Sequence, residues 1–169
     1  MNKKIVTLAL LSKIRERLRR KKQRVVFTNG TFDILHRGHV EYLEKAKRMG
    51  DILIVGLNTD SSIRKIKGPL RPINPNRDRA IVLAALRTVD YVCFFRENTP
   101  LRLIQALRPD VLVKGADWKT NNIVGSAVVK SGGGTVRRIP LRQGRSTSNV
   151  IQKVLQAYTV MPSRRRRRK

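Results

Sequence analysis

The sequence predicts an α/β protein whose Rossmann-like, doubly wound parallel sheet of about five strands lies between two layers of helices. Short β-rich or apolar runs alternate with segments of helical periodicity along the chain, a pattern typical of a parallel sheet covered on both faces. The run 52–57 is apolar throughout, as expected for a strand buried on both sides. A length of 169 residues suits one compact domain of this kind.

Five segments have the composition of strands, and each supports the predicted sheet. They are residues 24–28, 52–57, Tyr91–Phe95, 111–113 and Thr135–Ile139. The single cysteine, Cys93, lies in the third of them. This position predicts a buried core thiol rather than a nucleophile, and one cysteine cannot form an internal disulfide.

Five further segments have apolar residues at helical spacing. They are residues 7–22, 39–49, 77–87, 100–107 and 148–158. Gly50 follows the second helix and Pro100 begins the fourth, positions at which these residues are common. Residues 60–76 are rich in Pro and charge and predict a loop. Residues 115–134 predict an irregular segment with one short helix.

The charge of the chain is concentrated at its ends. The net charge is +27, residues 1–24 carry ten Lys or Arg and one acid, and residues 164–169 are all basic. We therefore expect a basic N-terminal helix over 1–23, one domain over 24–160 and a disordered basic tail over 161–169. Such a tail attracts polyanions non-specifically. No apolar run reaches the roughly 18 residues of a membrane helix, and no cleavable signal is apparent, so we expect a cytoplasmic protein without membrane contact.

Polar and unusual residues follow the ends of the predicted strands. They occupy residues 28–39, 58–60, 114–118 and 144–148. In parallel α/β sheets, ligands bind outside the carboxyl ends of the strands, where the strand order reverses. The sequence therefore predicts one site to which these four segments contribute.

The segment 28–39 carries the clearest chemistry. Gly30 permits close approach of a ligand to the backbone, and His36 and His39 lie three residues apart at the start of a predicted helix, on one side of it. A helix N-terminus and two imidazoles can bind phosphoryl oxygens as charge develops. A zinc pair would need further ligands, which neighbouring residues do not supply; two buried capping histidines are the structural alternative.

This segment resembles the signature Gly-x-Phe-Asp-x-x-His-x-Gly-His of the cytidylyltransferase-like nucleotidyltransferases, which stands intact over residues 30–39. Residues 144–148, Gly-Arg-Ser-Thr-Ser, resemble the second signature of that superfamily. Within it, the chain most resembles the adenylyltransferase domain of ADP-heptose synthase, from about residue 24 to about residue 158. The departures are Thr31, Trp118 and the basic ends. Thr31 and residues 115–118 are also similar to glycerol-3-phosphate cytidylyltransferase.

The resemblance implies transfer of AMP from ATP to D-glycero-β-D-manno-heptose 1-phosphate, with release of pyrophosphate, for lipopolysaccharide core synthesis. The alternative enzyme uses CTP and glycerol 3-phosphate or another polyol phosphate. An alternative of another class is a basic nucleic-acid-binding protein, but aromatics are only 5% of the chain and no recognition motif is present. Because dimers are common among members of the family, the resemblance also implies a homodimer.

The resemblance assigns His36, His39 and Lys67 to catalysis, with Lys65 as the second choice for the lysine. Arg71 and Arg79 would bind the pyrophosphate or the sugar phosphate, although either could be an ordinary surface cation. Mg²⁺ would bridge phosphate oxygens with few direct protein ligands, and no metal-ligating residue is assigned. The implied substrate-binding residues are Thr28, Asn29, Gly30, Thr31, Phe32, Asp33, Gly38, Lys65, Arg71, Arg79, Lys114, Gly115, Asp117, Trp118, Gly144, Ser146, Thr147 and Ser148.

Overall fold

The predicted sheet is confirmed. The computed structural model describes residues 2–116, 123–140, 144 and 146–159, and its five strands are all parallel, in the order β3-β2-β1-β4-β5. The order reverses between β1 and β4, which are neighbours in the sheet but not along the chain. The strands are β1 Val25–Gly30, β2 Ile52–Asn58, β3 Tyr91–Phe95, β4 Val111–Gly115 and β5 Thr135–Ile139.

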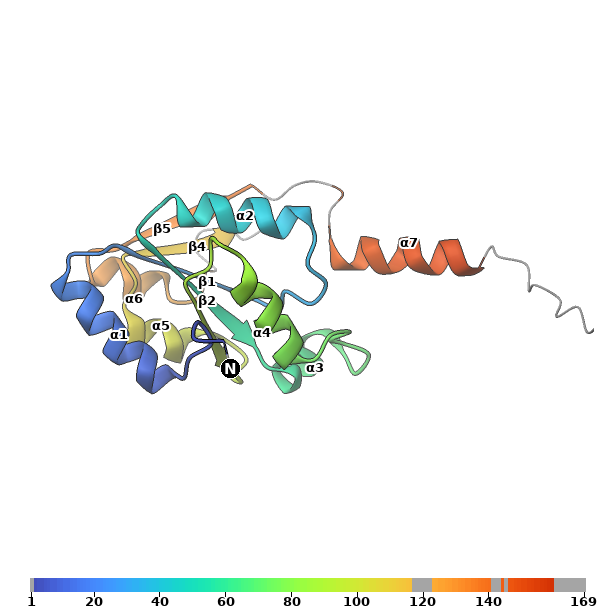
Figure 1. The fold of residues 1–169 in the computed structure, drawn as a ribbon, viewed down its shortest axis with the longest axis horizontal. Coiled ribbons are helices and arrows are strands. Elements are labelled where there is room, and N and C mark those ends of the chain that lie inside the picture. Colours follow the sequence, from blue (N-terminus) through green and yellow to red (C-terminus); the bar gives the residue numbers. More distant parts are fainter. Residues whose placement is uncertain (1, 117–122, 141–143, 145, 160–169) are drawn as a thin grey trace, which may run out of the picture.

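Helices cover both faces of the sheet and make the fold three-layered (Figure 1). α2 and α4 pack on one face through Leu43 and Leu83, and α1, α5 and α6 pack on the other through Leu11, Ile104 and Val129. The helices are α1 Leu8–Arg20, α2 Arg37–Lys47, α3 Asp60–Lys67, α4 Asn76–Ala85, α5 Leu101–Leu107, α6 Ser126–Ser131 and α7 Thr147–Thr159.

The strand residues alternate between two apolar cores. Val26 and Val55 belong to the core beneath α2 and α4, whereas Phe27 and Ile54 belong to the core beneath α1 and α5. This alternation follows from the two-residue period of a strand. Cys93 is 1% exposed, and burial raises the pKa of its thiol to about 11, which confirms the predicted core thiol.

The basic helix α1 is fastened to the sheet by one buried cation. Arg15 Nη2 lies 3.0 Å from Asp110 Oδ1, and Arg15 Nε donates to the carbonyl of Leu107 at 3.0 Å. The other oxygen of Asp110 accepts from the backbone N–H of Val25 at 2.7 Å. One carboxylate thus joins α1 to the amino ends of β1 and β4.

The prediction of a loop over residues 60–76 is wrong in its first half, because Asp60–Lys67 forms α3. Thr59 caps this helix with its hydroxyl, 3.4 Å from the N–H of Ser62, and the helix ends before Gly68 at φ 91°. Ser62 and Ile63 are its buried residues. A helix of only 8 residues, in a segment rich in Pro and charge, is too short for its spacing to stand out in the sequence.

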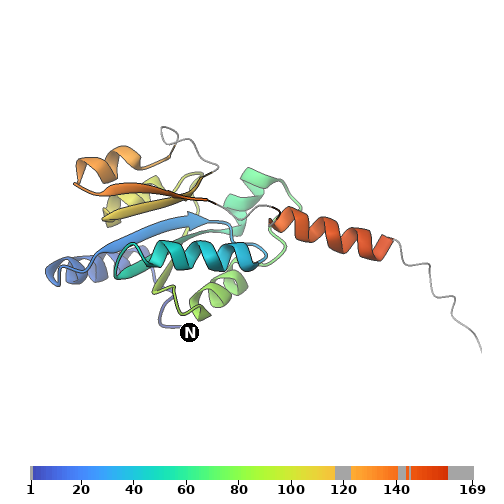
Figure 2. The same cartoon turned by 90° about the horizontal axis from the view of Figure 1, so that it is seen from above.

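The last helix, α7, extends away from the sheet in both views (Figures 1 and 2). None of its residues is buried, and Val154, Leu155 and Tyr158 are 51%, 61% and 73% exposed. The tail 161–169 lies outside the described residues, so its predicted disorder stays a prediction. Within the described part of the chain, no helix has the length and apolar character needed to span a membrane.

Candidate active site

A cavity of about 500 Å³ opens at the carboxyl ends of β1 and β4, where the strand order reverses. This is the position at which ligands bind in parallel α/β sheets. It confirms that the segments after β1, β2 and β4 meet at one place. The cavity is lined by Asn29, Gly30, Thr31, Phe32, His39, Tyr42, Asn58, Ile66, Lys67, Phe95, Asn98, Thr99, Pro100, Lys114, Gly115 and Val124.

The turn from β1 into α2 is shaped by Gly30 and Phe32. A Cβ on Gly30 would lie 2.9 Å from the Phe32 ring, closer than side chains pack. Phe32 is 5% exposed and has φ 43°, a left-handed conformation that is rare for a bulky residue and is found at functional sites. The buried Thr28 hydroxyl is 2.7 Å from the Tyr42 hydroxyl, so Thr28 positions a cavity residue and does not itself line the cavity.

The two histidines stand together at the N-terminus of α2. His36 is the N-cap residue, the N–H of His39 donates to its carbonyl at 2.9 Å, and the two rings stack with centroids 3.9 Å apart. Gly38 lies between them in the first turn of α2. The His39 ring also lies 5.2 Å from that of Phe32, and its Nδ1 is buried without a hydrogen-bond partner among the described atoms.

His39 is a neutral imidazole in this environment. Burial, the adjacent His36 and the charge of Lys67 lower the pKa of His39 from 6.5 to about 4. A neutral ring carries one N–H donor and one acceptor, and an anion placed beside it would favour the charged form. No group of three or more His, Cys, Asp or Glu suitable for a metal occurs among the residues described.

Two lysines from different elements bring positive charge to the cavity. Lys67 Nζ, at the end of α3, lies 3.5 Å from Thr31 Oγ1, and Lys114, at the end of β4, donates to Asn29 Oδ1. Although the Lys67 side chain is exposed, partial desolvation of its ammonium group and the charge of Arg71 lower the pKa of Lys67, and Asp33 opposes this change. Lys65 is exposed and does not line the cavity.

Asp33 and Arg71 form a clamp beside the cavity. Asp33 is 2% exposed and accepts from the backbone N–H groups of Ile73 and Asn74, both at 2.9 Å, and from Arg71 Nε at 2.7 Å. Burial acts to raise the pKa of Asp33, but the N–H groups of Asn74 and Ile73 and the Arg71 guanidinium together lower it. These bonds hold the loop that follows α3. Neither Asp33 nor Arg71 is among the residues that line the cavity, although both were expected to contact substrate.

Arg79 is a buried brace, which does not agree with its expected role as a phosphate ligand. Its side chain is 0% exposed and lies 2.7 Å from Asp60 Oδ1. It also donates to the carbonyls of Asn74, Thr31 and Asn58 at 2.9, 2.6 and 2.9 Å. These bonds join α4 to the ends of β1 and β2, because a guanidinium can satisfy several acceptors at once.

The described residues of the second signature, 144 and 146–148, do not line the cavity. Ser146 Oγ accepts from the N–H of Asn149 at 3.1 Å, as a residue that caps α7 does. Gly144, Thr147 and Ser148 also do not line the cavity. The predicted residues Asp117 and Trp118 lie outside the described residues.

Several cavity residues were not predicted as site residues. Asn58, which donates to Ser62 Oγ at 3.0 Å, ends β2, and Phe95 ends β3; their positions at strand ends were the available signal. Asn58 belongs to the predicted segment 58–60, and the residues added by the structure are Tyr42, Ile66, Phe95, Asn98, Thr99, Pro100 and Val124. Tyr42 lies within a helix and Val124 within the irregular segment 115–134, so neither position follows the end of a predicted strand.

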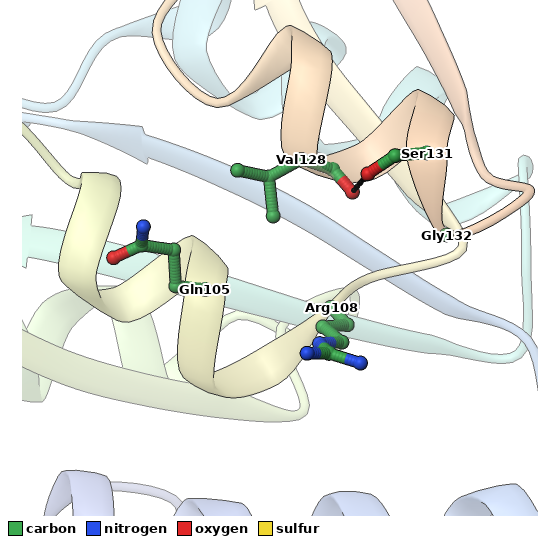
Figure 3. A pocket seen from close by; sticks show the side chains of 5 residues that line it. All are labelled: Gln105, Arg108, Val128, Ser131 and Gly132. Carbon is green, nitrogen blue, oxygen red and sulfur yellow. Dashed lines mark hydrogen bonds between the residues drawn. The ribbon is translucent and has the colours of Figure 1, made fainter.

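A separate pocket of about 390 Å³ lies between α5 and α6, away from this chemistry. Figure 3 shows Gln105 and Arg108 on one wall and Val128 and Ser131 on the other, with Ser131 Oγ donating to the carbonyl of Val128 at 3.1 Å. Gly132 completes the lining, which contains no acid and no histidine. These helix ends lead into β4 and β5, so the pocket is at the amino edge of the sheet.

Comparison with known proteins agrees with the class that the fold and the site define. The fold is Rossmann-like, and an imidazole and two ammonium groups meet at its switch point, where such groups can bind phosphate oxygens. The family model for cytidylyltransferase-like proteins matches residues 27–153. The chain therefore belongs to the cytidylyltransferase-like family and is a nucleotidyltransferase.

Among individual proteins, the chain is similar to the Bifunctional protein HldE of several bacteria. It is 52% identical to that of Trichlorobacter lovleyi over 156 residues, 92% of this chain and 32% of the relative. It is also 52% identical to that of Helicobacter pylori strain J99 over 148 residues, 88% of this chain and 31% of the relative. The chain thus spans about a third of the length of these relatives.

Solved structures show the same fold. The lipopolysaccharide core biosynthesis protein from Thermoplasma volcanium superposes with a TM-score of 0.60 and 28% identity, over 73% of this chain and 99% of that one. The pantoate-beta-alanine ligase from Francisella tularensis superposes with a TM-score of 0.59 over 90% of this chain and 78% of that one. At 18% identity, the second likeness concerns the fold alone.

Proposed function

We propose that this chain transfers the AMP moiety of ATP to D-glycero-β-D-manno-heptose 1-phosphate, giving ADP-heptose and pyrophosphate for lipopolysaccharide core synthesis. The proposal is supported by 52% identity to HldE proteins and by the resemblance to the adenylyltransferase domain of ADP-heptose synthase. A solved relative described as a lipopolysaccharide core biosynthesis protein adds to this support.

The reaction would be an in-line displacement. A phosphate oxygen of the sugar attacks the α-phosphorus of ATP, and the bond from that phosphorus to the pyrophosphate oxygen breaks. The attacking phosphate is largely ionised at neutral pH, since its second pKa is about 6 by analogy with phosphoserine. No general base is then needed, which agrees with a cavity lining that contains no Asp or Glu among the described residues.

The observation that carries the proposal is the convergence of His39, Lys67 and Lys114 on one cavity. Catalysis would rest on orientation of the phosphates and on neutralisation of charge that develops between them. His39 offers a neutral donor whose protonated form becomes more favourable beside an anion. The two lysines offer positive charges that come from different elements, Lys67 from the end of α3 and Lys114 from the end of β4, and both would bind the phosphates.

Magnesium is the expected ion of such a reaction. The cavity offers the side-chain oxygens of Asn29, Thr31 and Asn58, but no carboxylate from the described residues. Because Mg²⁺ favours carboxylates and phosphate oxygens, the ion would be held mainly by the phosphates of the nucleotide. When bound, it would neutralise part of their charge.

The proposal is tested by the choice of nucleotide and acceptor. We expect pyrophosphate release with heptose 1-phosphate to show at least a tenfold higher kcat/KM for ATP than for CTP, a difference of about 1.4 kcal/mol in transition-state binding. The matched measurement uses glycerol 3-phosphate with each nucleotide. Equal or reversed preference with the heptose substrate, or faster turnover of glycerol 3-phosphate with CTP, would favour the cytidylyltransferase alternative.

A further inference from the structure

A third pocket, also of about 390 Å³ but distinct from the one between α5 and α6, lies at the amino edge of the sheet, opposite the candidate active site. It is formed where α1 turns into β1, beside the starts of β4 and β5. Four cations and one carboxylate line it, and the proposed transfer reaction uses none of them. The lining residues are Arg15, Arg19, Lys22, Gln23, Arg24, Asp110, Gly133 and Thr135.

The charges of this pocket divide into an internal pair and three available cations. Arg15 and Asp110 neutralise each other at 3.0 Å. Arg19, Lys22 and Arg24 are exposed, and among the described residues they form no ion pair. Asp51 accepts from the backbone N–H of Arg24, not from its guanidinium. The pocket therefore has a net positive charge that the rest of the described protein does not offset.

A buried hydroxyl gives a second, independent indication of a ligand. Thr135 Oγ1 is buried and makes no hydrogen bond to any described residue, while Thr135 lines the pocket. A buried hydroxyl without a partner is unfavourable, and such a group calls for an unseen partner. The N–H of Thr135 is already donated to the carbonyl of Asp110 at 2.9 Å, so only the hydroxyl is available.

We infer that this pocket binds a compact phosphate-bearing anion, with Arg19, Lys22 and Arg24 as its cationic ligands and the Thr135 hydroxyl as a donor. Guanidinium groups match phosphate oxygens in geometry and charge. A compact ligand fits better than a nucleic acid, because no aromatic side chain of the described residues lines the pocket and base stacking is the usual basis of single-strand binding.

The test is a titration of the full chain with inorganic phosphate at constant ionic strength, followed by amide NMR. We expect saturable shifts at Lys22, Arg24 and Thr135, distinct from shifts at Gly30 and His39. The double variant Lys22→Ala, Arg24→Ala should weaken binding at this edge by about tenfold or more, since two charge-assisted contacts are lost. The control Lys13→Ala, Lys45→Ala removes the same charge from exposed positions and should change it less than about twofold.

Thr135→Val provides a second measurement that separates binding from folding. It should weaken phosphate binding at this edge by about fivefold or more, and the free energy of unfolding should stay the same or rise because the removed hydroxyl has no partner. The inference is overturned if the edge amides do not respond to phosphate, if the control pair weakens binding as much, or if Thr135→Val binds as tightly as the parent. It is also overturned if only an RNA oligonucleotide shifts these amides.

Discussion

At the scale of single residues, His39 shows how position decides chemistry. The same imidazole on the surface would titrate near neutrality, whereas burial, His36 and Lys67 lower its pKa to about 4. Its ring stacks on that of His36 and contacts that of Phe32, so neighbouring rings restrain its orientation before any substrate binds. Such preorganisation is the property that makes a donor effective in a transition state.

The first prediction concerns turnover. His39→Ala should lower kcat by about 100-fold or more, the scale of losing one well-placed transition-state donor, while circular dichroism shows a folded protein. Lys45→Ala, an exposed change on the same helix, is the control and should leave kcat unchanged. Turnover of His39→Ala within a few-fold of the parent, or zinc bound at the two histidines, would rule out the proposed role.

The second prediction concerns stability and pH. The folded protein holds the pKa of His39 at about 4, below the value of about 6.5 in an unfolded chain, so the unfolded state takes up the proton first. The free energy of unfolding should therefore fall as pH decreases from about 6.5 toward 4. Urea titrations across this range should show a smaller fall for His39→Gln than for the parent. Equal falls in the two proteins would contradict the lowered pKa.

At the scale of elements, the site depends on how the ends of β1, β2, α3 and α4 are joined. Arg79 makes that connection through three carbonyls and Asp60, and Asp33 holds the loop between α3 and α4. The family resemblance assigns both Arg79 and Asp33 to substrate binding. In the structure they support the site from behind the cavity.

The third prediction tests the brace. Arg79→Met should lower the free energy of unfolding by about 3 to 5 kcal/mol, because it leaves buried carbonyls and Asp60 without their partner. Arg77→Met, an exposed change two residues away on α4, should change the free energy of unfolding by no more than about 0.5 kcal/mol. Chemical denaturation of both variants measures the difference. An Arg79→Met protein of parental stability that has lost only kcat/KM would restore the phosphate-binding role.

At the scale of the whole molecule, the net charge of +27 on 169 residues opposes compaction. Like charges at this density repel one another, and salt screens the repulsion because the Debye length falls from about 10 Å at 0.1 M to about 3 Å at 1 M. The described residues form far fewer ion pairs than there are cations in the chain. Added salt should therefore stabilise the folded protein by weakening repulsion more than it destabilises the protein by weakening ion pairs.

The whole-molecule prediction is a rise of Tm with sodium chloride. Between 0.05 and 0.5 M we expect an increase of about 3 °C or more, which corresponds to roughly 1 kcal/mol for a protein of this size. A chain that ends at Ser163 lacks six of the cations and should show a smaller increase. Calorimetry of both chains in the same salt series makes the comparison; a Tm that falls with salt in the full chain would show that ion pairs dominate.

The sequence by itself determined the sheet, most helices and the edge of the sheet at which the cavity opens. Apolar runs such as 52–57 and helical spacings are local properties, and they survive folding because strands and helices must bury their apolar sides. The signature around His36 and His39 also stands in one continuous segment. These features could be predicted because each depends on residues that are close together in the sequence.

Only the tertiary structure decided which cations face the cavity. Lys67, Arg71 and Arg79 are equivalent as sequence, but Lys67 lines the cavity, Arg71 pairs with Asp33 and Arg79 is wholly buried. Tyr42 and Pro100 enter the site from elements that sequence pattern assigns only to structure. The physical reason is that a side chain's role depends on partners brought together from distant segments, and pairing between such segments leaves no periodic trace in the chain.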